Sequence, residues 1–176
     1  MHKRIAITGP ESTGKSLLTE QLAKYYNSSM VSEYVRDYFL NREYNYNIED
    51  LVTIAKGQLQ REEDIAETSV GSLFCDTEFI SFSVWSEVIY KHVPSWITEH
   101  VKNHRYDLYL LCNIDIDWEA DPLRKNSHNR QYIFDLFVKE LENNNFNYKV
   151  ISGIGEQRFN NAVTFVDELL NNVRKK

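Results

Sequence analysis

Gly9-Pro10-Glu11-Ser12-Thr13-Gly14-Lys15-Ser16 is the stretch of sequence that decides the fold. It matches the phosphate-binding pattern GxxxxGK[ST] at every fixed position. A short β-branched run at 4–8 precedes it, and apolar residues at helical spacing follow it from about 15 to 26. A strand before the motif and a helix after it are the context that a P-loop requires. The sequence therefore predicts a loop that binds the phosphates of ATP or GTP.

Each fixed position of the loop has a physical reason. Glycines let backbone N–H groups turn inward, and the N-terminus of the following helix favours an anion. Lys15 is expected to neutralise the β- and γ-phosphates, and Ser16 to ligate Mg²⁺. The residues predicted to contact the nucleotide here are Gly9, Glu11, Ser12, Thr13, Gly14, Lys15, Ser16 and Leu17.

Beyond the loop, short apolar runs alternate with helical patterns along the chain. Strands are expected at 4–8, 29–32, 69–75, 106–112 and 147–152. Helices are expected at 15–26, 36–40, 47–67, 80–91, from Pro94, at 131–142 and at 157–173. This alternation predicts a three-layer α/β P-loop kinase fold, with a five-stranded parallel sheet and helices on both faces. We expect one domain, residues 1–176, with a lid segment around 113–130.

Composition excludes several other classes of protein. The net charge is −6, with 20 basic and 26 acidic residues, which argues against a nucleic-acid-binding surface. No apolar run approaches the roughly 18 residues of a membrane span, and the N-terminus lacks the features of a signal peptide. We therefore expect a cytoplasmic protein that acts on a small molecule without a membrane or nucleic-acid partner. Cys75 and Cys112 are expected to be buried and reduced.

Asp76 ends the third predicted strand with a carboxylate. The carboxyl ends of parallel strands line the ligand crevice, and a P-loop site needs a second magnesium-directed acid there. Asp76 is therefore predicted to hold Mg²⁺ together with Ser16. The alternative is that Asp76 or Thr77 caps the helix that follows. Glu78 is a second candidate for the same ligand crevice, with less support from the sequence than Asp76.

Glu33 and Arg36 follow the second predicted strand, also at the carboxyl end of the sheet. They are three residues apart on a helical turn and can face one direction. They either form an exposed ion pair or bind the acceptor, with the carboxylate taking a hydroxyl proton and the guanidinium placing substrate or phosphate. As the general base we expect Asp76 first and Glu33 second.

The connection after the fourth predicted strand contains further candidates. Trp118 has a ring that can stack on a planar group, and Asp121 can bind a ribose or a cation, although a loop tryptophan more often packs on its own domain. Arg124 and Arg130 suit a lid that closes over the transferring phosphoryl group. Arg158, after the fifth strand, is expected either to flank the base of the nucleotide or to lie on the surface.

With these segments together, the chain resembles the ribosylnicotinamide kinase domain of the bacterial NadR regulators of NAD biosynthesis. The similarity extends over nearly the whole chain and is most specific in the connections after strands three and four. The segments that carry it are Gly9 to Ser16, Glu33-Tyr34-Val35-Arg36-Asp37-Tyr38, Phe74-Cys75-Asp76-Thr77-Glu78, Tyr106 to Leu111, Asp115 to Arg124, Ser152-Gly153 and Arg158.

The resemblance implies transfer of the ATP γ-phosphoryl group to the 5′-hydroxyl of nicotinamide riboside (NR), with Mg²⁺. It implies that Trp118 and Tyr34 hold the pyridinium ring and that Asp121 binds the ribose. One departure is Asp76-Thr77-Glu78, where the family has Asp-Thr-Asp. A second is that the strand of the P-loop begins within a few residues of Met1, so neither the adenylyltransferase activity nor the DNA binding of that family is expected.

Three functions follow from these observations. The first is an NR kinase, in which Lys15, Asp76, Glu33 and Arg124 carry the catalysis, and Tyr34, Arg36, Trp118 and Asp121 help to bind the substrate. The second is a kinase of another nucleoside or small metabolite. The third is a regulatory nucleotide-binding ATPase without a metabolite acceptor. The polar residues after strands two and four favour an acceptor pocket and hence a kinase. The sequence does not determine the donor nucleotide or the oligomeric state.

Overall fold

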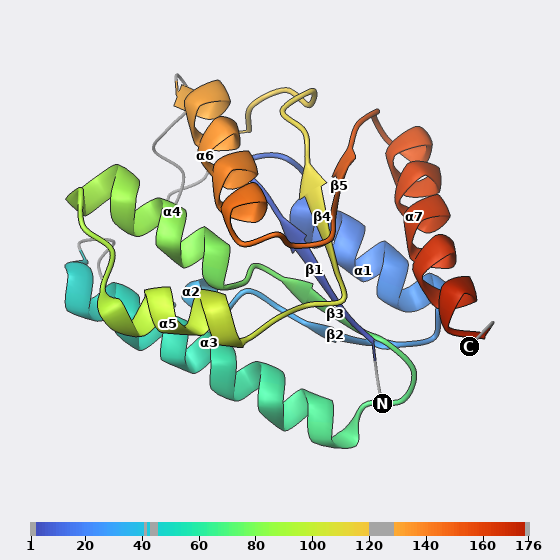
Figure 1. Cartoon of the computed structure of the whole chain (residues 1–176), viewed down its shortest axis with the longest axis horizontal. Coiled ribbons are helices and arrows are strands. Elements are labelled where there is room, and N and C mark those ends of the chain that lie inside the picture. The colour runs from blue at the N-terminus through green and yellow to red at the C-terminus, as the bar shows by residue number, and fades with distance from the viewer. Residues whose placement is uncertain (1–2, 41, 43–45, 120–128, 175–176) are drawn as a thin grey trace.

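The computed structural model describes residues 3–40, 42, 46–119 and 129–174, and it contains one parallel sheet of five strands (Figure 1). The strand order is β2-β3-β1-β4-β5, and every neighbouring pair is parallel. The predicted fold class, a five-stranded parallel sheet between helices, is confirmed. The strands are β1 (Arg4–Thr8), β2 (Ser29–Val31), β3 (Leu73–Asp76), β4 (Leu108–Cys112) and β5 (Tyr148–Ile151).

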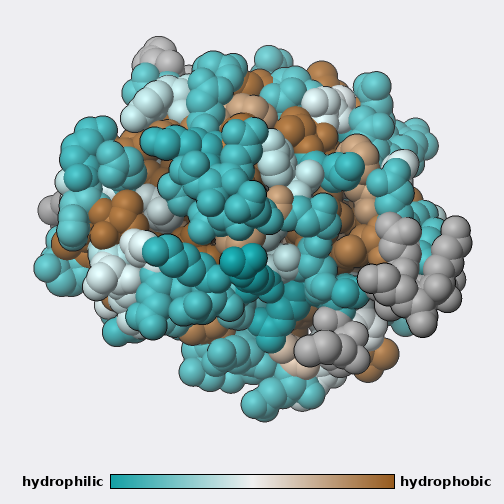
Figure 2. All heavy atoms as spheres, in the orientation of Figure 1, coloured by the Kyte–Doolittle hydropathy of each residue, from teal (hydrophilic) through white to brown (hydrophobic). Residues whose placement is uncertain are grey.

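Helices cover both faces of the sheet. In Figure 1, α1 and α7 lie on one side of the strands, and α3, α4, α5 and α6 lie on the other. The helices are α1 (Lys15–Tyr25), α2 (Tyr34–Tyr38), α3 (Ile48–Thr68), α4 (Phe79–Tyr90), α5 (Ser95–Asn103), α6 (Arg130–Asn143) and α7 (Glu156–Arg174). The face of the molecule in Figure 2 is mostly hydrophilic, with separate hydrophobic areas, as expected of a surface that faces water.

The two faces of the sheet follow from the alternation of side chains along each strand. Ile5 and Ile7 of β1 pack in the core beneath α1 and α7, whereas Ala6 between them packs in the core beneath α3 to α6. Both sets of side chains are fully buried. A strand buried on both faces has to be apolar throughout, which is why β1 and β4 read as continuous apolar runs in the sequence.

The register of the sheet determines where the site forms. Ile7 of β1 is paired with Asp76 of β3, and Thr8 is paired with Leu111 of β4. The P-loop leaves β1 at this edge, so it lies between the carboxyl ends of two neighbouring strands. Open parallel sheets bind their ligands at this edge.

Several element boundaries differ from the sequence prediction, most of them by one or two residues. β3 begins at Leu73 and not at 69, because Gly71 has a φ of +81° and turns the chain before the strand begins. α2 begins at Tyr34, two residues before the predicted start. The predicted cap of α3 is confirmed, since the Asn47 side chain accepts from the Asp50 N–H and Asp50 accepts from the Asn47 N–H.

A buried polar network lies at the opposite end of β1. Glu62 of α3 has a side chain only 1% exposed, and its carboxylate accepts hydrogen bonds from Arg4 Nη1 at 2.8 Å and Tyr106 Oη at 2.6 Å. His104 Nε2 lies 2.9 Å from the same carboxylate. Burial raises the pKa of Glu62, but its hydrogen bonds and these charges outweigh burial and leave the pKa below its usual value. This network ties α3 to the strands that carry the site.

Among the described helices, none is both long and apolar enough to cross a membrane.

Candidate phosphate and acceptor site

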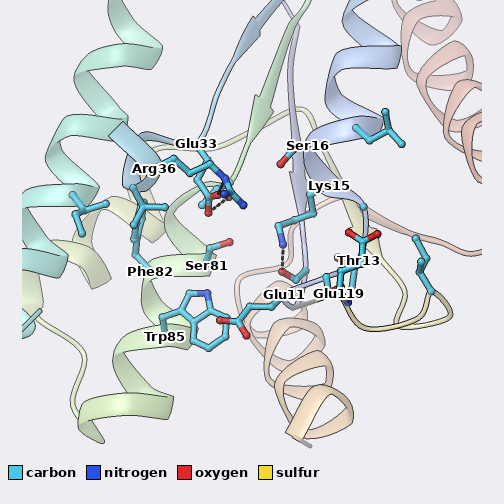
Figure 3. A pocket seen from close by; sticks show the side chains of 18 of the residues that line it. Glu11, Thr13, Lys15, Ser16, Glu33, Arg36, Ser81, Phe82, Trp85 and Glu119 are labelled. Atoms are coloured by element: carbon cyan, nitrogen blue, oxygen red, sulfur yellow. Dashed lines mark hydrogen bonds and ion pairs between the residues drawn. The ribbon is translucent and has the colours of Figure 1, made fainter. Parts of the chain in front are cut away.

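A cavity of about 480 Å³ opens at the carboxyl edge of the sheet (Figure 3). The P-loop forms one wall, and residues of α2, α3 and α4 form the others. It is lined by Gly9, Glu11, Ser12, Thr13, Gly14, Lys15, Ser16, Leu17, Glu33, Val35, Arg36, Tyr46, Leu51, Ile54, Thr77, Ser81, Phe82, Trp85, Ile116, Asp117 and Glu119. All eight residues predicted from the P-loop motif therefore line this cavity, together with two predicted acceptor residues, Glu33 and Arg36.

The conformation of the P-loop depends on its glycines. Gly9 has a φ of +130°, and a Cβ at this position would lie 2.8 Å from the carbonyl oxygen of Cys112. Gly14 has a φ of +75° at the N-cap of α1. Lys15 Nζ donates to the carbonyls of Gly9 and Pro10 at 2.9 and 2.8 Å, so the ammonium group lies over the loop. This arrangement directs positive charge and the helix N-terminus into the same part of the cavity.

Asp76 lies beneath the lining of the cavity and is 3% exposed. Its Oδ1 atom is buried and has no hydrogen-bond partner in the described part of the chain. Burial and the nearby carboxylate of Glu33 raise the pKa of Asp76 to about 6, while Lys15 and the Ser16 hydroxyl act in the opposite direction. A buried carboxylate oxygen without a partner is unfavourable, and a bound cation would offset this cost.

These residues fit a magnesium ion. Mg²⁺ prefers oxygen ligands and is usually held by one or two carboxylates plus substrate phosphates. The orphaned Oδ1 of Asp76 and the hydroxyl of Ser16 are such oxygens. Ser16 lines the phosphate end of the cavity, and its hydroxyl interacts with the Asp76 carboxylate. Within residues 3–40, 42, 46–119 and 129–174, no group of three or more His, Cys, Asp and Glu residues is placed to hold a metal without the substrate.

Glu78, rather than Asp76 or Thr77, caps α4. Its carboxylate accepts from the backbone N–H groups of Ile80 and Ser81 at 2.6 and 3.2 Å, and from Thr8 Oγ1 at 2.7 Å. The alternative interpretation of Asp76 as a helix cap is therefore wrong. Burial raises the pKa of Glu78 to about 7, against the effect of these hydrogen bonds. Glu78 is not among the residues that line the cavity.

Glu33 and Arg36 form the ion pair that their spacing allowed, with Arg36 Nε 3.5 Å from Glu33 Oε2. Both side chains line the cavity, and Figure 3 shows them opposite Lys15 and Ser16. The hydroxyl of Thr77 also donates to Glu33 Oε1 at 3.3 Å. The carboxylate of Glu33 is thereby held at the boundary between the phosphate end of the cavity and the rest of it.

The far end of the cavity contains aromatic residues that the sequence analysis did not select. Phe82 and Trp85 lie on α4, and Tyr46 precedes α3. α4 is apolar on nearly every side, so its pattern gives no sign of which residues face a ligand. The available signal was positional. Ser81 and Trp85 are four residues apart on the helix that begins just after Asp76, so they share the face nearest the site.

Tyr34, predicted to hold the acceptor ring, is not among the lining residues of the cavity. Its ring packs on the backbone of Gly57 in α3, where an added Cβ would lie 2.2 Å from the Cε1 atom. The guanidinium of Arg61 lies over the same ring, 4.9 Å from its centre. Both contacts hold α2 against α3 and leave the ring beside the cavity rather than in it.

Trp118 and Arg130 also lie outside the cavity lining, although their neighbours Ile116, Asp117 and Glu119 line it. Arg130 donates from Nη1 to the carbonyl of Ile116 at 2.8 Å and from Nη2 to that of Ser12 at 2.9 Å. Its guanidinium lies 5.9 Å from the centre of the Trp118 ring. In this structure Arg130 therefore braces the P-loop against the segment after β4.

Arg158 is 4% exposed, so the alternative of a surface residue is wrong. It pairs with Asp115 and donates to the carbonyls of Gly153 and Asn113 at 2.9 and 3.1 Å. These contacts join the ends of β4 and β5, and the side chain does not line the cavity. Two further predicted residues, Asp121 and Arg124, and half of the predicted lid (120–128) lie outside the described residues.

The strand order, the P-loop after the central strand and the cavity beside it define a P-loop nucleotide-binding domain. A family model described as "AAA domain" matches residues 4–158, and the chain belongs to that family. The predicted resemblance to NadR is confirmed. The chain is 28% identical over 98% of its length to the trifunctional NAD biosynthesis/regulator protein NadR of Escherichia coli K12, and 27% identical to that of Salmonella typhimurium. It spans only 44% and 43% of these two relatives.

Solved structures with the same fold include NadR, a nucleoside kinase and a nucleotide kinase. A NadR protein in complex with NR has a TM-score of 0.71 at 20% identity, covering 96% of this chain and 51% of that one. Thymidylate kinase from Ehrlichia chaffeensis has a TM-score of 0.64 at 14% identity, covering 94% of this chain and 97% of that one. Deoxyadenosine kinase from M. mycoides with bound dATP has a TM-score of 0.59 at 11% identity, covering 94% of this chain and 100% of that one. At these identities the similarity establishes the fold.

Proposed function

We propose that this protein is a small-molecule kinase that transfers the γ-phosphoryl group of ATP to the 5′-hydroxyl of nicotinamide riboside. The observation that carries the proposal is one continuous cavity, which joins the P-loop to a second end lined by carboxylates and aromatic rings. A nucleotide-sensing ATPase has no need of such a second end. A kinase needs one, because its acceptor must lie in line with the transferring group.

Lys15 and the N-terminus of α1 bind the β- and γ-phosphates and offset their charge. Ser16 and Asp76 would hold Mg²⁺, which neutralises charge on the phosphate oxygens when it is bound. Glu33 lines the cavity whereas Asp76 lies beneath it. We therefore assign the acceptance of the hydroxyl proton to Glu33, the second choice from sequence, and metal binding to Asp76. Arg36 orients the Glu33 carboxylate through their ion pair.

The choice of NR as the acceptor is supported by the relatives. NadR is the curated relative from two bacteria, and a NadR structure of the same fold contains NR. Another has been solved with NAD and AMP-PNP, at a TM-score of 0.72 and 20% identity, which supports ATP as the donor. On this proposal Trp118, Asp121, Arg124 and Arg130 belong to a lid at 113–130 that closes over the nucleotide, and Arg158 flanks its base.

A second candidate function is phosphorylation of another nucleoside. The fold of deoxyadenosine kinase favours it, because that structure covers 94% of this chain. The two candidates differ in the ring that the far end of the cavity accepts and share the chemistry at the P-loop.

An assay of ADP release distinguishes these functions. The purified protein is incubated with ATP, Mg²⁺ and one of nicotinamide riboside, adenosine, thymidine, cytidine or no acceptor, and the product is identified by mass. We expect nicotinamide mononucleotide in equal amount to ADP. Phosphorylation of another nucleoside without that product would support the second candidate. Slow ADP release that no acceptor changes would identify a regulatory ATPase.

A further inference from the structure

The far end of the cavity has an unusual combination of a carboxylate from the P-loop and an indole from α4. Figure 3 shows the side chain of Glu11 leaving the P-loop and pointing across the cavity toward Trp85. Both residues line the cavity. Burial is the main cause of the raised pKa of Tyr46, and the charge of Glu11 adds a smaller contribution, which places this carboxylate near the third aromatic residue of the cavity lining. Glu11 therefore faces the acceptor end, although the P-loop motif assigns its position to the nucleotide.

Trp85 is placed beyond the phosphoryl-transfer point. It lies four residues after Ser81, which is one turn or about 6 Å along α4, and Ser81 lies beside the end of β3. An acceptor hydroxyl near Glu33 thus places the ribose beside Ser81 and the base near Trp85. Within the described part of the chain, no lysine or arginine lies over the ring of Trp85, whereas Arg61 and Arg130 lie over Tyr34 and Trp118.

The charge at this end of the cavity favours a cation. Among the described residues that line the cavity, four are carboxylates: Glu11, Glu33, Asp117 and Glu119. The basic residues of this described lining are Lys15, which lies over the phosphate loop, and Arg36, which pairs with Glu33. An indole face attracts a positively charged ring through its quadrupole, and a carboxylate across a partly enclosed cavity adds direct attraction.

We propose that Glu11 and Trp85 form a ring subsite that selects a cationic base over a neutral one. The pyridinium ring of the acceptor lies against Trp85, and the carboxylate of Glu11 faces its positive charge. Glu11 and Trp85 are thus specificity-determining residues for the base of the acceptor. This inference rests on the proposed function, because it concerns the acceptor end of the same cavity, and it adds the property by which that acceptor is recognised.

The test uses two acceptors that differ in charge and hardly in shape. Nicotinamide riboside carries a positive ring, and its dihydro form is neutral. Dissociation constants of both are measured calorimetrically for the wild type and for Glu11→Gln, Trp85→Leu and Trp85→Phe. Glu20→Gln, on the exposed side of α1, is the matched control for loss of one carboxylate. Circular dichroism and thermal unfolding check that each variant is folded.

We expect the wild type to bind the cationic riboside more tightly than the dihydro form. Glu11→Gln should weaken binding of the cation about tenfold and change that of the neutral form less than about twofold. Trp85→Leu should also reduce the preference, Trp85→Phe should retain part of it, and Glu20→Gln should match the wild type. The inference would be overturned if Glu11→Gln weakened binding of both ligands equally. It would also be overturned if Glu11→Gln and Trp85→Leu left the ratio of the two dissociation constants unchanged.

Turnover is measured separately with the same two ribosides. The ratio of the two dissociation constants is measured without phosphoryl transfer. Loss of the preference for the cationic ring and absence of kinase activity are therefore separate results. A wild type that binds the cation preferentially and transfers no phosphate contradicts the proposed function and leaves the subsite supported. A wild type that phosphorylates NR while the two variants keep the wild-type ratio contradicts the subsite alone. A wild type that binds neither riboside overturns the subsite.

Discussion

The ring of Tyr34 lies directly against the backbone of Gly57, so close that a Cβ at Gly57 would be 2.2 Å from the Cε1 atom. This contact joins α2, which carries Glu33 at its N-cap and Arg36 within it, to the long helix α3. The position of the acceptor residues therefore depends on a glycine in the interior of a helix, where alanine is ordinarily the better residue.

Replacing Gly57 by alanine should destabilise the protein by about 2 kcal/mol, because the new methyl group overlaps the Tyr34 ring and overpacking typically has this effect. Urea unfolding at pH 7.5 measures the change. In a Tyr34→Ala background the same substitution should be neutral or stabilising, since the overlap is gone and helix propensity improves. If Gly57→Ala is equally destabilising in both backgrounds, the contact is not the reason for the glycine.

Lys15→Ala should reduce phosphoryl transfer at least about a hundredfold, since removing one group that stabilises developing charge has an effect of this size. Among the described residues that line the cavity, the ammonium group of Lys15 is the only cation that lies over the P-loop. ADP release in the presence of nicotinamide riboside measures the effect. Lys24→Ala, at the other end of α1, is the control and should keep the wild-type rate. A Lys15→Ala variant with appreciable activity would argue against the proposed kinase function.

Asp76→Asn should separate activity from stability. The pKa of Asp76 is raised from 3.8 to about 6, so its ionised form is disfavoured by folding. This penalty is absent below the unfolded pKa and complete above the folded one, so it grows as the pH rises between them. The asparagine variant should therefore be more stable than the wild type by about 2 kcal/mol at pH 8, and the gain should shrink toward pH 4.

The same variant should lose about a hundredfold in turnover and need more Mg²⁺ for half-maximal rate, because an amide is a weaker ligand than a carboxylate. Unfolding curves at several pH values and rates at increasing Mg²⁺ concentration measure the two effects. Loss of stability at pH 8 together with an unchanged magnesium requirement would count against the proposed role of Asp76.

Glu62→Gln should have the opposite dependence on pH. The pKa of Glu62 lies below its usual value of 4.5, so its stabilising effect is present above the unfolded pKa and is lost as the pH falls through the folded one. At pH 7 the variant should be less stable by about 2 kcal/mol, because Arg4 and Tyr106 lose a buried charged partner. The difference should narrow below about pH 4. Glu63→Gln, the exposed neighbour, should behave as the wild type at every pH.

The sequence was most informative where local rules determine the structure. The P-loop, the strand before it and the helix after it follow from glycine geometry and hydrophobic periodicity, and the predicted β1 has the observed bounds Arg4–Thr8. The late start of β3 and the capping role of Glu78 were missed. Both depend on the left-handed backbone of Gly71 and Thr77, and propensity does not determine where a chain turns.

The acceptor end was harder to predict, because it is built from residues that are far apart in the chain. Trp85 and Phe82 belong to a helix so apolar that ligand-facing and core-facing positions look alike. Tyr34 had the expected chemistry for a ring platform, but Gly57 lies 23 positions later and provides space for its ring on α3. Only the three-dimensional packing distinguishes an aromatic residue that faces the cavity from one that joins two helices.

Ser12 gives the P-loop a second property. Its carbonyl accepts from Arg130, and its hydroxyl accepts from the N–H of Glu119 at 2.8 Å and donates to the carbonyl of Asp117 at 3.4 Å. Ser12 is part of the phosphate-binding loop, and it also contacts the segment after β4 and the first residue of α6. We therefore expect any effect of the position of the connection between β4 and α6 on nucleotide affinity to be matched by an equal effect of the nucleotide on that position. On the proposed function, hydrogen bonds that never touch the nucleotide would then contribute to the rate at which it is released.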